Sequence, residues 1–260
     1  MKALTTQYNP LFALTNIMRD VQTYTINNTA SNSAVALKNY VKAIKEIATK
    51  SELYEQYRAM GGSQNGYYGE NMYLDAYNKA RPGNKKITPK GVLTAVPNAI
   101  EKVGNFTEMI PRVAEYMNTI DRLGNTNEGR LQASYNAADV TVNFNRSSTL
   151  STFANAFVPY FNAGLQGVDK TARQIKAHPG KTTARATASV FLPTLIFYLI
   201  NKDNPNWEDV KDGVRDSYYL IPNYAGPVDK NGYAETFIRI PKSREFGALF
   251  SASFERFVNV

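Results

Sequence analysis

Residues 88–120, TPKGVLTAVPNAIEKVGNFTEMIPRVAEYMNTI, carry the clearest apolar periodicity of the chain. Large apolar residues return there every three or four positions, as they do along one face of an α-helix. They are Val92, Val96, Ile100, Val103, Phe106, Ile110, Val113, Met117 and Ile120. Thr88 followed by Pro89 is a favourable helix start, so we predict a long helix from this point. Because proline breaks the hydrogen-bond ladder, the helix should be kinked, or split into two, at Pro97 and Pro111.

The same periodicity extends outward from this stretch in both directions. Upstream, one amphipathic helix follows Pro10 and ends at Asn27, and a second runs from Ser33 until Gly61-Gly62. Downstream, Gly124 ends the long helix. Further helices are expected over residues 70–80, 128–142, 149–177 with an interruption at Pro159, 186–201, a short segment capped by Asn206, and 244–260.

Only one part of the chain has the alternation typical of strands. Residues 218–222 and 236–240 are rich in Tyr, Ile and Phe and are joined by a loop that contains Gly, Pro and Asn. We therefore predict a mainly α fold, an irregular multi-helix bundle with kinked long helices and one small antiparallel β-hairpin near the C-terminus.

The domain organisation should be simple, because no break in composition divides the chain. We expect one helical module over residues 1–260. Within it, residues 1–84 form an N-terminal helical subregion, residues 88–202 the core helices, and residues 206–260 the hairpin with the closing helix.

Composition excludes several classes of active site. The 260 residues include no cysteine and one histidine, His178, so disulfides, thiolate metal sites and zinc sites with two histidines are ruled out. His178 precedes Pro179 at a predicted helix end, where the carbonyl dipole favours a cation. The chain also lacks the glycine patterns of dinucleotide and phosphate-binding loops and the G-x-S-x-G elbow of hydrolases. We expect no enzymatic activity, no cofactor and no metal.

A carboxylate-dependent glycosidase is the remaining enzymatic alternative, because such enzymes need only two acidic residues. Glu108 and Glu115 are seven positions apart and would share one face of the long helix. We interpret them as part of its solvated face.

The charge balance is basic, with 30 Lys and Arg against 22 Asp and Glu and a formal net charge of +8. Two clusters stand out: Lys79, Arg81, Lys85, Lys86 and Lys90, and Lys170, Arg173, Lys176, Lys181 and Arg185. Either cluster could neutralise phosphates in nonspecific binding to DNA, or could simply form a solvated surface.

The longest apolar stretch, residues 186–200, lies between Arg185 and Lys202. It is shorter than the roughly 20 residues of a membrane span, so we predict a buried core helix. The alternative is a membrane-active helix, since Phe197 and Tyr198 lie near one end and basic residues lie at both. The first residues lack the pattern of a signal peptide, so cytoplasmic expression is expected.

Two segments of the central region resemble a known phage module. They are AADVTVNFNRS at residues 137–147 and FVPYFNAGLQG at residues 157–167, and NPLFALTNIMRD at residues 9–20 is similar to the approach to it. The chain is similar over most of its length to a phage large polyvalent protein associated domain, of the type numbered thirty-eight. We interpret the motif residues as structural: Asp139, Thr141, Phe144, Arg146, Phe161, Asn162, Gln166 and Gly167.

The resemblance implies a helical, non-catalytic module of a bacteriophage or prophage protein that is packaged in the virion and delivered with the genome. Its location would be the virion interior and, after delivery, the host cytoplasm or envelope. The implied partners are nonspecific DNA, other virion or ejection proteins, or further domains of a longer parent chain. Membrane contact is the alternative, and a small-molecule ligand is not expected.

Overall fold

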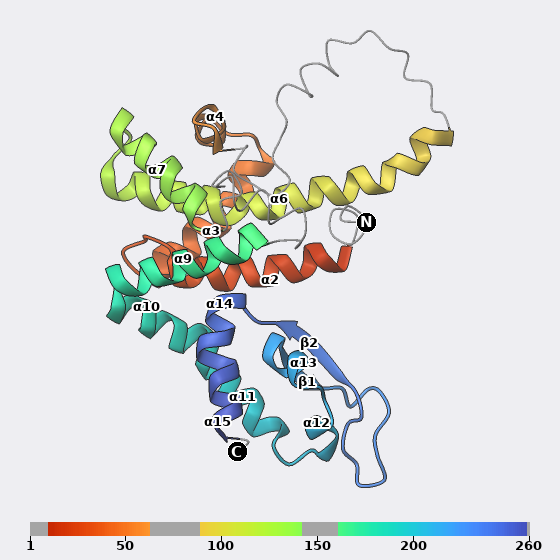
Figure 1. The fold of residues 1–260 in the computed structure, drawn as a ribbon. Helices are drawn as coiled ribbons and strands as arrows, with labels where there is room; N and C mark the ends of the chain where they lie inside the picture. The colour runs from red at the N-terminus through yellow and green to blue at the C-terminus, as the bar shows by residue number, and fades with distance from the viewer. Residues whose placement is uncertain (1–9, 63–88, 142–160, 259–260) are drawn as a thin grey trace. The chain divides into compact units, whose positions relative to one another are not determined.

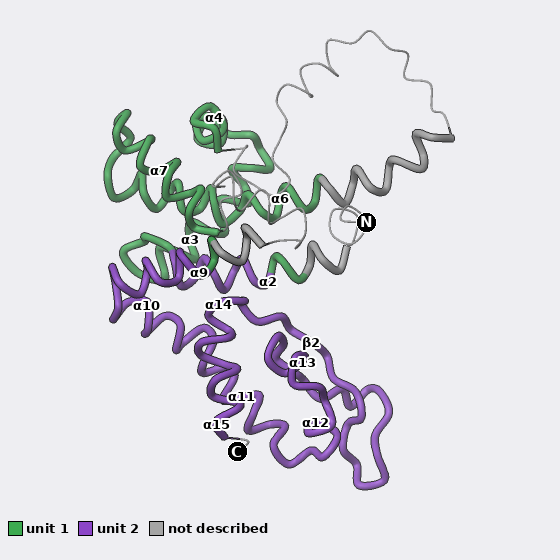
Figure 2. Tube along the Cα trace, in the orientation of Figure 1, with its two compact units in different colours: residues 1–17, 28–167 green, residues 18–27, 168–260 purple. Residues whose placement is uncertain are grey.

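The computed structural model describes residues 10–62, 89–141 and 161–258. These residues form helices and one two-stranded antiparallel sheet near the C-terminus, which confirms the predicted mainly α fold with a hairpin (Figure 1). The chain divides into two compact units, residues 1–17 with 28–167 and residues 18–27 with 168–260 (Figure 2). The predicted core region, residues 88–202, is therefore shared between the two units.

Unit 1 is organised around α6 (Pro89–Leu123), on which α3 (Ser33–Ala48), α4 (Glu52–Ala59) and α7 (Asn127–Asp139) pack. Helix α6 begins and ends where the sequence predicts, with Gly124 at a φ of +82° directly after it. Of the two predicted alternatives, the split into two helices is wrong, because the helix continues through both Pro97 and Pro111. Every residue of 109–119 is buried, so this part of α6 is enclosed on all sides rather than amphipathic.

The predicted single helix over residues 33–61 is also wrong, because the chain turns at residues 49–51. Lys50 adopts the left-handed conformation, with a φ of +48°, and this ends the run of helical residues. The hydroxyl of Ser51 then accepts a hydrogen bond from the backbone N–H of Tyr54 at 3.2 Å and caps the start of α4. The turn lets α3 and α4 pack separately on α6.

Unit 2 contains a continuous helical segment with a widened turn in the middle. Helix α10 (Pro179–Ala186) passes into the π-helix η2 (Thr187–Phe191) and then into α11 (Leu192–Asn201). Pro193 has no N–H to donate to the carbonyl of Ser189, and the N–H of Leu192 donates instead to Thr187 in a π-type bond. Helix α9 (Phe161–Ala177) precedes this segment.

A second helical segment closes the chain, and it lies beside α11 (Figure 1). It consists of α14 (Arg244–Gly247), the π-helix η3 (Ala248–Ala252) and α15 (Ser253–Val258). The ring of Phe254 packs edge-on against Phe191, with centroids 5.0 Å apart, and against Tyr198 at 5.9 Å. The buried cluster of Ile26, Ala186, Val190 and Phe246 ties these helices to the last turns of α2 (Pro10–Asn27).

The hairpin pairs β1 (Tyr218–Pro222) with β2 (Phe237–Pro241), close to the predicted strands. Asn201 anchors β1 to α11, because its side-chain amide donates to the carbonyl of Leu220 at 2.8 Å. Two short helices, α12 (Pro205–Glu208) and α13 (Asp212–Ser217), lie between α11 and β1 in the sequence. The cap of α12 is Asn204 rather than the predicted Asn206, whose backbone N–H donates to the Asn204 side chain at 3.0 Å.

Candidate functional site

The two carboxylates considered for glycosidase chemistry have structural partners. Glu115 is 1% exposed, so its predicted place on a solvated face is wrong. Its two carboxylate oxygens accept the backbone N–H of Thr29 at 3.1 and 3.0 Å, and one also accepts the amide of Asn118 at 3.1 Å. Glu108 forms an ion pair with the buried Arg112 at 3.1 Å. Both carboxylates therefore stabilise the packing of α6 within unit 1.

The two basic clusters differ in how far the structure describes them. The side chains of the first cluster, Lys79, Arg81, Lys85, Lys86 and Lys90, lie outside the described residues.

In the second cluster, Lys170 is buried, Arg173 pairs with Asp169 at 2.9 Å, and Arg185 donates to the carbonyl of Ile26 at 3.4 Å. Lys176 and Lys181 remain exposed. The five side chains therefore do not form one uniform phosphate-binding surface.

His178 lies at the junction of α9 and α10, as the sequence predicts for a helix end. Its backbone N–H donates to Gln174 and its carbonyl accepts from the N–H of Thr182, each at 2.9 Å. The residue is exposed. Among the described residues, no group of three or more His, Cys, Asp or Glu side chains is placed to hold a metal ion.

The motif residues from the phage resemblance are only partly described. Asp139 is the last residue of α7, and Thr141, two residues further on, is buried. Gln166 is half-buried and Gly167 is buried in the second turn of α9, whose first residues are Phe161 and Asn162. Phe144 and Arg146 lie outside the described residues, so the considered pairing of Arg146 with Asp139 does too.

An exposed apolar face is the most unusual surface of unit 2. Within the described residues, one helix is long and apolar enough to cross a membrane, the 23 residues from Pro179 to Asn201, yet only 17% of its apolar window is buried. The predicted buried core helix is therefore wrong for most of this segment. One side is buried through Ala186, Val190 and Thr194. The opposite side exposes Leu192 by 46%, Ile196 by 54%, and Leu199 and Ile200 by 53% each.

The closing helix enlarges this surface. Leu249 is 53% exposed and Phe257 is 82% exposed, and they lie on the same side of the helix, about two turns apart. Phe254 of α15 packs on Phe191 and Tyr198, so the closing helix lies directly beside the segment that contains α11. We call Leu192, Ile196, Leu199, Ile200, Leu249 and Phe257 the outer apolar face. The sequence places these residues at helical spacing but gives no sign that they stay exposed.

Comparisons with protein-family models, with curated protein sequences and with solved structures give no match to this chain. The resemblance to a phage polyvalent domain stays a prediction, and the function rests on the surfaces of the two units.

Proposed function

We propose that this chain is a non-enzymatic helical module of a virion-packaged phage protein, and that its C-terminal unit binds lipid membranes through the outer apolar face. The phage setting comes from the sequence resemblance alone. The membrane role is supported by one observation: in an apolar helix of 23 residues, only 17% of the apolar window is buried in the folded unit. Large contiguous apolar patches on soluble domains mark contacts with proteins or membranes.

The surroundings of the face favour a lipid surface as its partner. No charged residue lies between Arg185 and Lys202, and the two basic residues flank the apolar stretch. Full burial of one large apolar side chain stabilises by about 1.5–3 kcal/mol, so even partial immersion of six side chains drives binding. The net charge of +8 adds attraction to anionic lipids.

The packed side of the helix argues for binding in the membrane plane rather than across the bilayer. Val190 and Ala186 belong to the buried cluster of unit 2, and the hydroxyl of Tyr219 donates to the carbonyl of Val190 at 3.3 Å. Asn201 is fixed to β1. A spanning helix would lose all these contacts, whereas a helix lying in the interface keeps them and immerses only its exposed side.

Vesicle flotation tests the proposal. We expect the protein to float with vesicles of phosphatidylglycerol and phosphatidylcholine, and the variant Leu192→Ser/Ile196→Ser/Ile200→Ser to lose at least about tenfold in partitioning, given the transfer energies of these side chains. The matched control is Val103→Ser/Leu131→Ser in unit 1, where the two residues are 54% and 61% exposed. Circular dichroism checks that all variants keep their helix content. Wild-type protein that stays with the soluble fraction, or an α11 variant that floats as well as the wild type, would contradict membrane binding.

Contact with DNA is a second candidate function, favoured by the net charge of +8 and by the exposed Lys176 and Lys181. It uses a different surface from the outer apolar face. The two functions can therefore be tested with separate variants.

A further inference from the structure

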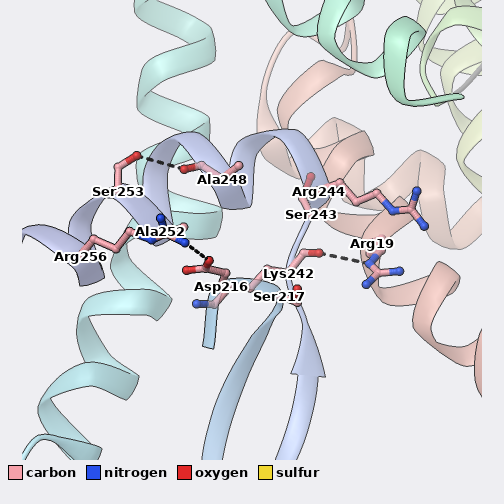
Figure 3. A pocket seen from close by; sticks show the side chains of 10 residues that line it. All are labelled: Arg19, Asp216, Ser217, Lys242, Ser243, Arg244, Ala248, Ala252, Ser253 and Arg256. Carbon is pink, nitrogen blue, oxygen red and sulfur yellow. Dashed lines mark hydrogen bonds and ion pairs between the residues drawn. The ribbon is translucent and has the colours of Figure 1, made fainter. Parts of the chain in front are cut away.

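A basic pocket of about 540 Å³ lies in unit 2, between α2, the end of α13, the segment after β2 and the closing helix (Figure 3). Its volume falls within the roughly 300–1,000 Å³ that is usual for small-molecule sites. Four basic residues and one acidic residue line it: Arg19, Lys242, Arg244, Arg256 and Asp216. The pocket therefore has an excess of positive charge.

Two of these cations are neutralised within the protein. A terminal nitrogen of Arg256 contacts the carboxylate of Asp216 at 2.5 Å. The ammonium group of Lys242 donates to Glu255 at 2.7 Å. In the part of the chain that the structure describes, Arg19 and Arg244 have no carboxylate within ion-pair distance. The cations of the pocket without an ion pair are thus the two guanidinium groups, although Asp20 and Tyr218 favour the charged form of Arg19.

The guanidinium groups of Arg19 and Arg244 lie close enough for their positive charges to repel each other. The Nε of Arg19 donates to the carbonyl of Lys242 at 3.3 Å, which ties the guanidinium to the residue two positions before Arg244 (Figure 3). Burial lowers the pKa of Arg19, and the positive charge of Arg244 lowers it further. Arginine still stays protonated, so the pocket places two like charges close together, and a bound anion would reduce their repulsion.

We propose that this pocket binds a phosphate group, with Arg19 and Arg244 as its main ligands. A guanidinium donates two parallel hydrogen bonds to phosphate oxygens, and a phosphate monoester has up to two negative charges for the two cations that lack an ion pair. Ser217 and Ser243 add hydroxyl groups to the lining. Binding of a phosphate group to this pocket does not depend on the proposed membrane binding.

The phosphate could belong to a soluble molecule or to a lipid headgroup. Ser253 lines the pocket and lies on the closing helix between Leu249 and Phe257 of the outer apolar face, four residues from each. The rim of the pocket thus adjoins the surface proposed to enter the membrane. The headgroup of phosphatidic acid is a phosphate monoester like glycerol 3-phosphate, so separate experiments must distinguish the two sources.

The first experiment uses soluble phosphate without any membrane. Titration calorimetry of the full chain with inorganic phosphate and with glycerol 3-phosphate, at low ionic strength, should give saturable binding in the millimolar range or tighter. We expect Arg244→Gln to weaken it at least about tenfold, as loss of a charge-assisted contact does. The matched control is Arg239→Gln, which removes the same charge from an exposed position on β2 of the same unit. Arg244 is exposed too, so neither change should disturb folding.

Absence of binding by the wild type would overturn the phosphate site. An equal loss in Arg244→Gln and Arg239→Gln would also overturn it, because the effect would then be one of net charge. Arg19→Gln, checked for its melting temperature, should weaken binding like Arg244→Gln, and unchanged affinity in both variants counts against the assignment.

A second experiment identifies the source, using vesicles that contain phosphatidic acid. If Arg244→Gln weakens vesicle binding and glycerol 3-phosphate competes with it, the ligand is a lipid headgroup. If vesicle binding is unchanged while soluble binding is lost, the ligand is a free phosphorylated molecule. Either result supports the phosphate site. Failure of the protein to bind any vesicle contradicts the membrane proposal and leaves the soluble measurement valid by itself.

Discussion

Lys242 and Glu255 show how single buried charges organise the C-terminal unit. Lys242 is 1% exposed, and its ammonium group donates to Glu255 and to the carbonyl of Arg215, each at 2.7 Å. The same group lies 5.2 Å from the ring centroid of Tyr219. Burial lowers the pKa of Lys242 and raises the pKa of Glu255, and the attraction between the two charges opposes both shifts. The pair joins the residue after β2 to α15, and Lys242 also lines the basic pocket.

Removing one member of this pair should destabilise the protein strongly. Lys242→Met leaves Glu255 buried without its counter-charge, so we expect the free energy of unfolding to fall by about 3–5 kcal/mol in urea denaturation. The double variant Lys242→Met/Glu255→Leu removes both charges and should recover most of that loss. A single variant as stable as the wild type, or a double variant no better than the single, would contradict this account of the pair.

At the level of single elements, the loop between the strands depends on one carboxylate. One oxygen of Asp229 accepts the backbone N–H groups of Asn231 at 2.8 Å and Tyr233 at 2.9 Å, and the other accepts the amide of Asn206 at 3.2 Å. The hydrogen bond from Tyr233, followed by those from other groups, lowers the pKa of Asp229 below its ordinary value of 3.8. The ionised carboxylate therefore holds the turn.

This shift predicts how the loop responds to pH. Because the folded-state pKa of Asp229 is lower than the unfolded value, its stabilising contribution is complete above pH 3.8 and is lost as pH falls through the folded pKa. We expect the amide proton of Tyr233 to lose hydrogen-exchange protection only below pH 3.8, while Asp229→Asn shows reduced protection at neutral pH. Protection of this amide that persists in acid, or in the Asn variant, would show that the carboxylate does not hold the loop.

The helices and strands also show which features can be predicted from the sequence. The start of α6 at Pro89, its end before Gly124 and the two strands follow local rules, and the structure has them close to where these rules predict. The turn at Lys50 does not follow a local rule, because lysine has no preference for a left-handed conformation. Only the packing of α3 and α4 on α6 selects this conformation.

The candidate sites are harder to predict from the sequence than the helices are. Helical spacing identifies the apolar side of α11, but whether another element covers it depends on the tertiary structure. Arg19 and Arg244 are 225 positions apart, so no local pattern connects them. Periodicity predicts Glu115 to be a surface residue, yet its carboxylate is buried and accepts the backbone N–H of Thr29. Contacts between distant segments determine each of these outcomes.

At the scale of the whole molecule, the net charge of +8 and the outer apolar face imply two separate tests. Charge acts over a distance and depends on salt, whereas apolar burial depends on contact and responds little to salt. Binding to vesicles should therefore persist at salt concentrations that abolish binding to DNA. The two candidate functions can then be told apart with the same wild-type protein.

The DNA prediction is a salt titration with random-sequence duplex DNA. Each phosphate contact changes the slope of log K against log salt by about 0.9, so Lys176→Gln/Lys181→Gln should reduce the slope by up to about 1.8 if both side chains contact the backbone. Lys38→Gln/Lys45→Gln, which removes the same charge from exposed positions on α3, is the matched control. The variant with Lys79, Arg81, Lys85 and Lys86 reversed to Glu tests the first cluster. Tight, salt-dependent binding that Lys176→Gln/Lys181→Gln weakens more than the control does supports a role beside DNA. No binding by the wild type at low salt contradicts that role, and equal losses in Lys176→Gln/Lys181→Gln and in the control reduce the interaction to nonspecific attraction by net charge.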